Sequence, residues 1–582
     1  MSAFKELALV FERLGATSSS TAMIGILARF LPRLSPQEVR ETAYLLSGKV
    51  GPSFSAPEFG MADKLIARAM AQAFGVPVER IDTMAVRSGD LGDVAERLAP
   101  ARRGRLSIAT VFTELSRIAR ISGAGSQRDK IDTLAELLRA SEAVEAKYIV
   151  RTVSGRHRIG AAEMTFLHGL AKAFGGSKDE KPALEQAYNV LSDLGEVAFR
   201  VARGGLRSLK RIGPKPGIPV RMMLATRVEE LDEVPRHIPG EMFVEYKYDG
   251  ERAQVHKDAR GTIRVFSRRL EDITHQYPEV IEHVRKALTA RSAIIEGEVV
   301  AIDRKTGHLL PFQLLMQRKR KRDIAHYRAH VPVALFLFDA LYLNGKSLLA
   351  TPLVERKRLL ARHFKSDRTA GIGTFVRTAE IAEAEEVFHE AIAHGAEGVV
   401  IKGASSPYQA GHRGWHWIKF KKEYRKELAD TFDVVVVGAV FGKGSRAGTY
   451  GSLLVAAFDP PTNKYYSFTK IGAGFSDALL RSLPKKLKPY LIPQRDRLVE
   501  TGMKMDVWFE PAVVLEISGA DLTISPVHTV ARTTLKRGGI ALRFPRLLRI
   551  RDDKTAEQAT TVREILAMYR QRTSAGRAAI PA

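Results

Sequence analysis

The chain has no cysteine among its 582 residues. Disulfide bonds, cysteine-ligated zinc sites and cysteine nucleophiles are therefore excluded. Any bound metal must be held by oxygen or histidine ligands, and the 15 histidines do not form a His-Glu-x-x-His motif. Carboxylate oxygens are the remaining choice, and Mg²⁺ is the ion that suits them best.

Long apolar runs are also missing. No stretch is long and apolar enough to cross a bilayer, and the first residues, Met1–Glu6, lack the pattern of a signal peptide. We therefore predict a cytoplasmic protein without a membrane partner, associated with the nucleoid if its source is prokaryotic. At this length two to four domains are expected, because one core rarely serves so many residues.

Acidic residues are few relative to basic ones. The 91 lysines and arginines face 65 aspartates and glutamates, which gives a formal net charge of +26. Such an excess predicts a polyanionic partner, most simply DNA or RNA. A basic protein that is merely soluble is one alternative. A membrane-surface protein is another, and it is disfavoured because neither a basic amphipathic anchor nor a lipidation signal stands out.

The pattern of residues divides the chain into three predicted domains, so the fold class is multidomain α+β. Residues 1–212 read as an all-α domain, which ends in a Pro/Gly-rich linker at 211–220. Residues 213–424 alternate strand-like and helical segments, as in a mixed α/β domain. Residues 425–582 are β-rich and predict a small five-stranded barrel of the oligonucleotide-binding (OB) type.

The expected elements follow from apolar periodicity. In the second domain we expect strands at 242–248, 294–302, 333–343, 398–401 and 417–420, and helices at 278–288 and 382–393. In the third domain we expect strands at 432–440, 453–458, 465–471 and 513–518, with a hairpin turn at 459–464.

The helical region carries one long apolar stripe and two basic loops. The stripe predicts an amphipathic helix over 184–201. The loops, at 122–130 and 151–160, contain glycines and precede helices, where backbone N–H groups are able to approach a phosphate. They fit binding to a sugar–phosphate backbone, although ordinary interhelical turns account for them equally well.

Lys247 lies in the most informative octet of the chain, Glu245–Arg252. An apolar approach precedes this lysine and an Asp-Gly turn follows it, which is typical of a strand that delivers a lysine to a pocket. A lysine in a partly desolvated, cation-rich site loses its proton more easily and becomes a nucleophile. The tetrapeptide Lys-x-Asp-Gly alone is equally consistent with a surface hairpin.

The same domain supplies the other groups that a nucleotide site requires. Glu296 and Glu298 alternate along a strand and should share a face. Phe338 lies in a strand where an aromatic ring could stack on a purine, although core packing is the commoner fate of such a residue. Further carboxylates and cations follow in order, namely Glu397, Lys402, Arg413, Lys419 and Lys421, with Arg252 and Arg268 before them.

Taken together, these motifs resemble those of the ATP-dependent DNA ligases, a family within the covalent nucleotidyltransferase superfamily. They occur in the family's order, at 247–252, 267–274, 296–298, 336–343, 397–402, 417–421 and 543–554, followed by 559–561. The helical first region, with Arg158–Gly160, resembles the DNA-binding domain of the large archaeal and eukaryotic replicative ligases. The resemblance covers nearly the whole chain.

The resemblance implies an adenylation (nucleotidyltransferase) domain that uses ATP and Mg²⁺. Lys247 would carry AMP through a phosphoramidate bond. Glu245 would contact the adenine amino group, and Phe338 would stack on the ring. Mg²⁺ and the nucleotide would be positioned by Glu298 and Glu397.

The resemblance also assigns roles to the cations. The ribose and phosphates would be held by Arg252, Arg268 and Arg413, although family members vary around Arg413. The α-phosphate would be bound by Lys419 and Lys421, and the departing pyrophosphate would be oriented by Arg551 and Lys554 as the OB domain closes on the site.

The implied function is sealing of nicks in duplex DNA during replication, repair and recombination. AMP passes from the lysine to the 5′-phosphate, and the 3′-hydroxyl then displaces it. The expected partner is nicked double-stranded DNA, and the expected state is a monomer. A sliding clamp is the protein partner to consider, but no clamp-binding peptide is evident.

Other functions remain open at this point. An RNA ligase and an mRNA-capping guanylyltransferase share Lys-x-Asp-Gly, but the helical region and the 543–554 segment favour a DNA ligase. An NAD⁺-dependent ligase is disfavoured because its four-cysteine zinc module cannot form. A non-catalytic nucleic-acid scaffold is disfavoured because Lys247 and both predicted metal-binding glutamates are present.

Overall fold

A computed structural model describes residues 2–100, 106–157, 159–160, 163–175, 181–303, 306–310, 312–319, 324–367, 369–421, 431–442, 449–519, 521–536 and 538–578. Its contacts define two compact units. One unit comprises 1–225, 249–374 and 403–417, and the other comprises 226–248, 375–402 and 418–582. The division into domains at 212 and 424 stays a prediction, and the second boundary lies outside the described residues.

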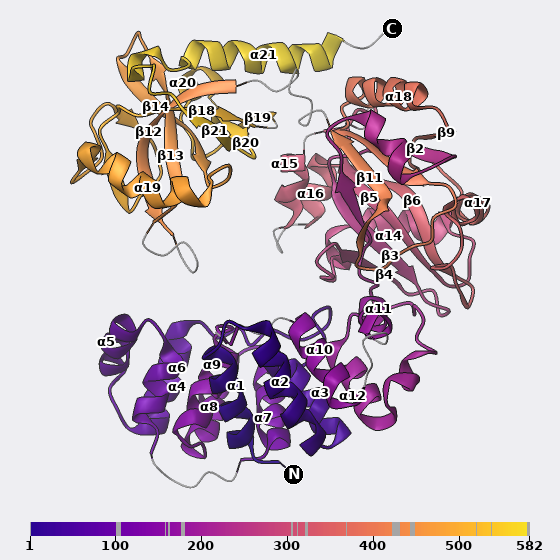
Figure 1. Ribbon diagram of the computed structural model, residues 1–582, viewed down its shortest axis with the longest axis vertical. Coiled ribbons are helices and arrows are strands. Elements are labelled where there is room, and N and C mark those ends of the chain that lie inside the picture. The colour runs from indigo at the N-terminus through magenta and orange to yellow at the C-terminus, as the bar shows by residue number, and fades with distance from the viewer. Residues whose placement is uncertain are drawn as a thin grey trace. The chain divides into compact units, whose positions relative to one another are not determined.

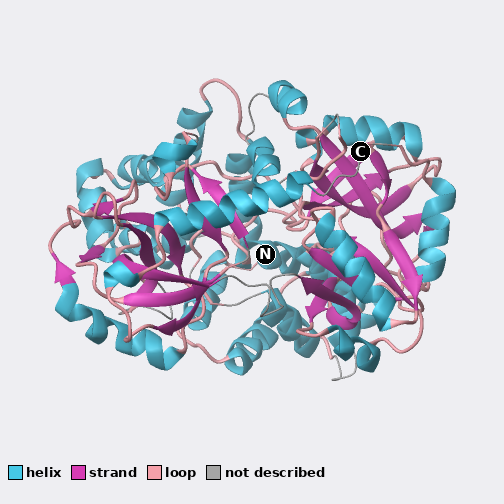
Figure 2. Ribbon diagram, turned by 90° about the horizontal axis from the view of Figure 1, so that it is seen from above, coloured by secondary structure: helices cyan, strands magenta, loops and turns pink. Residues whose placement is uncertain are grey.

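The N-terminal region is helical, as predicted (Figure 1), and the strands, magenta in Figure 2, all come after it in sequence. Local sequence signals begin its helices: Ser35 and Glu38 form a reciprocal capping box, and Pro36 occupies the first turn of α3. The helices are α1 (Phe4–Gly15), α2 (Ser20–Phe30), α3 (Pro36–Leu46), α4 (Asp63–Phe74), α5 (Val78–Ser88), α6 (Leu91–Leu98), α7 (Ile108–Arg120), α8 (Ser126–Arg139), α9 (Ala143–Val153), α10 (Glu163–Ala173), α11 (Lys181–Leu191) and α12 (Leu194–Gly204).

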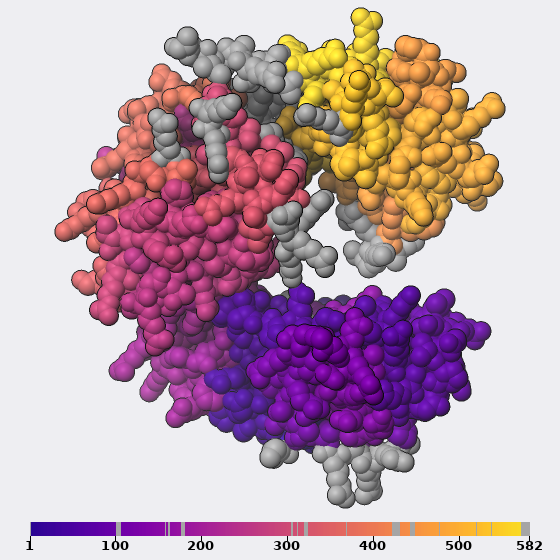
Figure 3. Space-filling view, turned by 180° about the vertical axis from the view of Figure 1, so that it is seen from behind, coloured from indigo at the N-terminus to yellow at the C-terminus, as the bar shows by residue number. Residues whose placement is uncertain are grey.

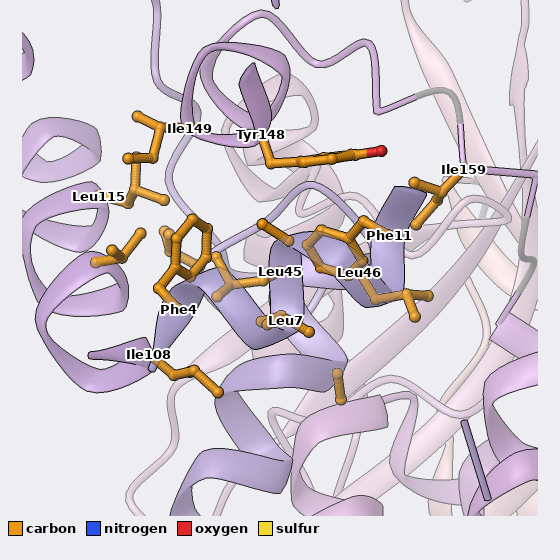
Figure 4. Close-up of a cluster of buried hydrophobic side chains, with 14 of the residues drawn as sticks. Phe4, Leu7, Phe11, Leu45, Leu46, Ile108, Leu115, Tyr148, Ile149 and Ile159 are labelled. Atoms are coloured by element: carbon orange, nitrogen blue, oxygen red, sulfur yellow. The ribbon is translucent and has the colours of Figure 1, made fainter. Parts of the chain in front are cut away.

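One apolar core holds these helices together. Figure 4 shows Phe4, Leu7 and Phe11 of α1 among side chains from α3, α7 and α9. Phe11 is fully buried, and its ring centroid lies 5.2 Å from that of Tyr148. Burying an aromatic or aliphatic side chain of this size contributes roughly 1.5–3 kcal/mol. The core therefore packs the helices of this region into one compact body. Its surface is coloured indigo and purple in Figure 3.

The predicted helix over 184–201 is wrong, because two helices occupy that stretch. The helix is interrupted at Ser192, which has a left-handed φ of 49°. Asp193 then caps α12 by accepting a hydrogen bond from the Glu196 N–H at 2.9 Å. The apolar stripe continues across the break, since both helices pack on the same core. The N-cap aspartate was the available sequence signal.

The two basic loops differ from what their sequences suggest. Arg151 is not in a loop, because it lies within α9, is 9% exposed and forms ion pairs with Asp90 and Asp93. Lys130 is also buried, and its ammonium donates to the Phe59 carbonyl at 2.5 Å. Neither cation is therefore available to a phosphate. Arg128 remains 89% exposed at the start of α8, and Arg158 lies outside the described residues.

Two sheets follow in sequence. The six-stranded sheet has the order β4-β3-β5-β6-β7, with β8 added to β6, and the five-stranded sheet has the order β1-β11-β10-β2-β9. The six-stranded sheet contains β3 (Glu251–Lys257), β4 (Ile263–Ser267), β5 (Ala293–Ala301), β6 (Val333–Leu343), β7 (Lys346–Ser347) and β8 (Ala370–Ile372). The five-stranded sheet contains β1 (Leu224–Arg227), β2 (Met242–Lys247), β9 (Phe375–Thr378), β10 (Gly398–Gly403) and β11 (Arg413–Lys421).

Short helices accompany these sheets. They are α13 (Val234–His237), α14 (Pro278–Ala287), α15 (Phe312–Met316), α16 (Ile324–His330), α17 (Leu353–His363) and α18 (Ile381–Ala393). The predicted strands and the two predicted helices of this region are present within a few residues of their expected limits. The mixed α/β prediction is confirmed.

The C-terminal region is β-rich, as predicted, and contains more strands than five. Its main sheet has the order β15-β17-β12-β13-β14-β16, with β18 joined to β12 and β21 to β18, and β19 pairs separately with β20. The predicted hairpin is present, because β13 and β14 are antiparallel with Asp459 opposite Lys464. Several additional strands have only two or three residues, which is too short for a periodic pattern to reveal.

The elements of this region are β12 (Thr431–Phe441), β13 (Tyr450–Asp459), β14 (Lys464–Ile471), α19 (Asp477–Leu487), β15 (Leu491–Ile492), β16 (Val499–Glu500), β17 (Val507–Phe509), β18 (Val514–Ser518), β19 (Asp521–Ser525), α20 (Arg532–Leu535), β20 (Gly539–Arg543), β21 (Arg546–Ile550) and α21 (Val562–Ala578). In the described part of the chain, no helix is both long enough and apolar enough to span a membrane.

The Pro/Gly-rich linker is tied to strand β3 by buried polar groups. The Gly217 N–H donates to His256 Nδ1 at 3.0 Å. The amide of Gln254 makes two bonds to the Val220 backbone, accepting at 2.8 Å and donating at 3.0 Å. Both side chains are at most 1% exposed. The linker is therefore a fixed part of the structure at these residues.

Acid is expected to destabilise the protein through His256. Burial, aided by the positive charge of Arg264, lowers the pKa of His256 to about 3 from an ordinary value of 6.5. Between these values the unfolded chain binds a proton that the folded chain does not. The stabilisation is complete above about pH 6.5 and falls by roughly 1.4 kcal/mol per pH unit below it. Urea unfolding at pH 7 and pH 5 measures the change.

The test variant is His256→Gln, and the matched control is His330→Gln. Glutamine does not titrate, so His256→Gln should reduce the pH dependence of the unfolding free energy by about one proton. His330 is exposed, and its replacement should leave the dependence unchanged. The same slope in the parent and in His256→Gln would contradict this role.

Candidate active site

Strand β2 ends at Lys247, in agreement with the predicted strand that delivers the lysine. The turn after it is tight, and β3 begins at Glu251. A Cβ atom at Gly250 would lie 2.3 Å from the Val299 carbonyl oxygen, so only glycine fits there. The Asp-Gly pair therefore lets the chain turn closely against β5 immediately after the lysine.

Lys247 belongs to a cluster of charged side chains on the five-stranded sheet. Its Nζ lies 2.6 Å from Glu397 Oε2, and the Nζ of Lys421 lies 3.0 Å from the same oxygen. The Glu397 N–H also donates to the Lys247 carbonyl at 2.9 Å. We call Lys247, Glu397 and Lys421 the lysine cluster. It joins three strand ends that are separated by up to 174 residues of sequence.

The charge state of Glu397 follows from its neighbours. Burial alone would raise the pKa of its carboxyl group, but the positive charges of Lys247 and Lys421 outweigh burial and hold this pKa well below its usual range. Glu397 is therefore a carboxylate at neutral pH. A carboxylate shared by two ammonium groups keeps both of them in place.

Glu245 makes a second ion pair on the same sheet. Its Oε2 lies 2.6 Å from the Nζ of Lys402, and the two side chains are 7% and 2% exposed. Both strands place these residues in the interior, where an uncompensated charge would be costly. The pair fixes the direction of the Glu245 carboxylate.

The six-stranded sheet carries a separate group of side chains around Arg252. The Nη2 of Arg252 donates to Glu296 Oε2 at 2.7 Å, and Nη1 donates to the Met223 carbonyl at 2.6 Å. The hydroxyl of Tyr408 donates to the same oxygen of Glu296 at 2.9 Å, and Gln254 donates to its other oxygen at 3.0 Å. We call Arg252, Glu296, Tyr408 and Gln254 the arginine cluster.

Aromatic rings border this cluster. The guanidinium carbon of Arg252 lies 5.3 Å from the ring centroids of both Phe338 and Trp417. Phe338 is only partly buried, so it keeps an accessible part of its surface, unlike the core phenylalanines. Burial alone would lower the pKa of Arg252, but Glu296 and Tyr408 outweigh it and raise that pKa. The arginine is therefore a permanent cation beside two aromatic rings.

The remaining predicted residues occupy less enclosed positions. Glu298 is partly exposed on β5 and pairs in register with Arg252 on β3.

Lys419 and Lys421 are both partly exposed on β11, while Ile418 and Phe420 are buried. The predicted shared face of the two lysines is therefore confirmed. Arg268 and Arg413 are exposed, and within the described residues no ion pair or hydrogen bond joins them to either cluster.

Oxygen donors for Mg²⁺ are present but few. Across the described ranges, no group of three or more His, Asp or Glu side chains is arranged to hold a metal ion. Mg²⁺ fits such a site only when one or two carboxylates and the phosphates of a nucleotide share its coordination. Glu298 suits this role as a partly exposed carboxylate. Glu397 suits it less well, because two lysines already neutralise it.

Arg551 and Lys554 lie in the C-terminal region and converge on one carboxylate. Asp433 on β12 lies 3.0 Å from Arg551 Nη1 through Oδ1 and 2.6 Å from Lys554 Nζ through Oδ2. Arg551 also pairs with Asp553 at 2.7 Å. The structure therefore brings together the two cations that the last motif supplies.

Sequence reasoning passed over three residues that these clusters depend on. Glu296 was singled out only as a neighbour of Glu298, yet it is fully buried and forms the centre of the arginine cluster. Tyr408 and Asp433 lie outside the motifs. The pairing of Gln254 with Glu296 across β3 and β5 could have indicated a buried polar network, whereas Tyr408 comes from a loop and gave no periodic signal.

Replacing Glu296 with alanine is expected to destabilise the protein by about 3–5 kcal/mol, because Arg252 would remain buried without its counterion. Urea unfolding measures this loss. The matched control is Glu282→Ala, which removes an ion pair of 2.5 Å with Arg328 whose side chains are 47% and 41% exposed. An exposed pair of this kind contributes less than about 1 kcal/mol. Equal losses in the two variants would contradict the central role of Glu296.

Comparison with known proteins identifies relatives of the whole chain. The family model described as "ATP dependent DNA ligase domain" matches residues 222–421, "DNA ligase N terminus" matches 3–171, and "ATP dependent DNA ligase C terminal region" matches 446–554. The chain is 43% identical to a DNA ligase of Caldivirga maquilingensis, with 97% of each chain covered, and 43% identical to one of Aeropyrum pernix, with 98% of each covered.

A solved structure described as "Pmar-Lig_PreS3" shares the fold. It is 16% identical in sequence, with a TM-score of 0.51, and the match covers 94% of this chain and 99% of that one. The family matches include both sheets with the lysine and arginine clusters, as well as Arg551 and Lys554. The chain therefore belongs to the ATP-dependent DNA ligase family.

Proposed function

We propose that Lys247 is the nucleophile of an adenylation reaction that prepares the protein to seal nicks in duplex DNA. The observation that carries this proposal is the position of Lys247 at the end of β2, held by Glu397 beside Lys421. In the first step a bond forms between Lys247 Nζ and the α-phosphorus of ATP, the bond to the β-phosphate oxygen breaks, and pyrophosphate leaves. AMP then passes to the 5′-phosphate of the nick, and the 3′-hydroxyl displaces it.

The attack requires a neutral amine. Lys247 therefore gives up a proton to solvent when the nucleotide phosphates enter and its ion pair with Glu397 breaks. Lys421 stays close and offsets the negative charge that develops on the α-phosphate. Lys419 on the same face of β11 adds a second cation to this role.

The remaining roles follow from the motifs residue by residue. Glu245 contacts the adenine amino group, and Phe338 stacks on the ring. The ribose and phosphates are bound by Arg252, Arg268 and Arg413, and the departing pyrophosphate is oriented by Arg551 and Lys554. The arginine cluster supports this assignment for Arg252, because a buried counterion fixes its direction.

Mg²⁺ would be held by Glu298 and the nucleotide phosphates, with Glu397 as a further oxygen donor once its lysines have engaged the nucleotide. When bound, the ion neutralises phosphate charge and makes pyrophosphate a better leaving group.

We propose nicked double-stranded DNA as the partner, a cytoplasmic monomer as the working form and a sliding clamp as the protein partner to test. The net charge of +26 supports a DNA partner. The proposed domains are 1–212 for DNA binding, 213–424 for adenylation and 425–582 for the OB fold. Each of the three family matches lies within one of these ranges, which supports the proposed division.

The test has two parts. The protein is incubated with radiolabelled ATP, GTP or NAD⁺ in Mg²⁺, and covalent label is detected after denaturing electrophoresis. We expect label from ATP. Sealing of a nicked DNA duplex is then compared with sealing of the same nick in RNA, and we expect DNA to be sealed faster. Label from GTP alone would favour a capping-type reaction, and a preference for RNA would favour an RNA ligase.

A further inference from the structure

Asp433 connects the two cations of the last motif, although it lies more than a hundred residues before them. Its carboxylate uses both oxygens, since Oδ1 and Oδ2 lie 3.0 and 3.2 Å from Arg551 Nη1 and Oδ2 lies 2.6 Å from Lys554 Nζ. The side chains of Asp433 and Arg551 are 14% and 13% exposed. A single carboxylate therefore lies between two cations that would otherwise repel each other.

The backbone of Asp433 is fixed more firmly than that of a surface residue. Its N–H donates to Thr560 Oγ1 at 2.9 Å, and its carbonyl accepts from the Thr560 N–H at 2.8 Å. It lies within β12, opposite Glu516 of β18. Arg551 has two further carboxylates nearby: Glu516, whose Oε2 lies 3.6 Å from Nη1, and Asp553, which is 61% exposed and follows Arg551 by two residues. Asp433 is the anchored partner of Arg551, and Asp553 is the exposed one.

The two cations border an open cavity of about 480 Å³ in the C-terminal region. Its lining includes Arg551 and Lys554 together with Lys486, which pairs with Asp552 at 3.0 Å. This volume lies within the range that small ligands occupy. Cations that are held at the wall of such a space are oriented before a phosphate arrives, so less entropy is lost when one binds.

We propose that Asp433 is a positioning residue for the first step of the reaction, holding Arg551 and Lys554 side by side so that together they bind the pyrophosphate portion of ATP. This inference rests on the proposed function of those two cations. Asp433 itself does not contact the nucleotide. It acts by fixing the direction of the guanidinium group and by offsetting the repulsion between the two positive charges.

The role is specific to one step. Pyrophosphate is present only while Lys247 is being adenylated, and it is absent when AMP moves to DNA or when the nick closes. Loss of Asp433 should therefore slow formation of lysyl-AMP and leave the closing of a nick that already carries AMP on its 5′-phosphate unchanged. A residue needed only for folding would affect both reactions alike.

The experiment compares Asp433→Asn with Glu500→Gln in the full-length protein. The asparagine keeps the shape and loses the charge. The control removes a charge from an ion pair in the same region, Glu500 with Lys464 at 2.6 Å, whose side chains are 40% exposed. We expect Asp433→Asn to lower the single-turnover rate of lysyl-AMP formation, and the rate of pyrophosphate exchange into ATP, by roughly ten- to a hundredfold. Sealing of a pre-adenylated nick without ATP should change less than about twofold, and Glu500→Gln should change neither rate.

Arg551→Gln separates failure of this inference from failure of the proposed function. If Arg551→Gln slows lysyl-AMP formation and Asp433→Asn does not, the inference is overturned while the role of Arg551 stands. Normal adenylation by Arg551→Gln would overturn the role on which the inference rests. Equal losses in adenylation and in sealing of the pre-adenylated nick would overturn the inference, because they indicate damage to the fold. The last measurement uses a variant that carries both Asp433→Asn and Arg551→Gln. If its rate of lysyl-AMP formation is no lower than that of Arg551→Gln alone, the two residues are coupled.

Discussion

Replacing Lys247 with alanine should eliminate covalent labelling by ATP and reduce nick sealing by at least about a thousandfold. The expected loss is large because no other group can replace a nucleophile that forms a covalent intermediate. Two other lysines lie on the same sheet, but Lys402 is paired with Glu245, and Lys421, which shares Glu397 with Lys247, has the separate proposed role of offsetting charge on the α-phosphate. Labelling with α-radiolabelled ATP and gel assays on a nicked duplex measure the two effects.

Lys464→Ala is the matched control for this loss. Lys464 also forms an ion pair with a glutamate at 2.6 Å, but it lies in the C-terminal region and is 40% exposed. Its replacement should leave labelling unchanged. The strongest evidence for Lys247 as the nucleophile would come from sealing of a pre-adenylated nick, because this last step does not require a free lysine amine and should retain more activity than the overall reaction. Full labelling of Lys247→Ala would exclude Lys247 as the AMP carrier.

Much of the region around Lys247 could be predicted because local rules govern it. A run of apolar residues followed by Asp-Gly gives a strand and a turn, and alternation places Lys419 and Lys421 on one face of β11. These patterns depend on neighbouring residues alone. The same locality explains why most strands and helices were found within a few residues of their limits.

The hydrogen-bond partners and counterions of the site residues could not be predicted because they are contributed by distant segments. Tyr408 reaches Glu296 across 112 residues of sequence, and Asp433 reaches Lys554 across 121. Neither is part of a periodic pattern, and only the folded chain brings each to its partner. Burial of Arg151 and Lys130 was missed for a related reason, since a basic residue in a polar sequence gives no sign that Asp90 or the Phe59 carbonyl will pair with it.

Affinity for nicked duplex DNA is expected to fall by roughly 10³- to 10⁵-fold between 50 and 200 mM salt, if six to ten phosphates are contacted. The physical reason is release of counterions from DNA as basic side chains neutralise its phosphates, a gain in entropy that added salt removes. The net charge of +26 supplies enough cations for this number of contacts. Fluorescence anisotropy with a labelled nicked duplex, measured at several salt concentrations, gives the slope of log K against log salt.

Arg128 tests where those contacts lie. Its side chain is 89% exposed in the first turn of α8, after a loop in which Gly123 and Gly125 have left-handed φ values of 93° and 81°. Arg128→Gln should reduce the magnitude of the slope by about one, whereas Arg151→Gln should leave the slope unchanged, because Arg151 is already neutralised within the helical core. A slope near zero for the parent protein would mean that basic surfaces do not hold the duplex, and binding would then have to depend on apolar or shape-specific contacts alone.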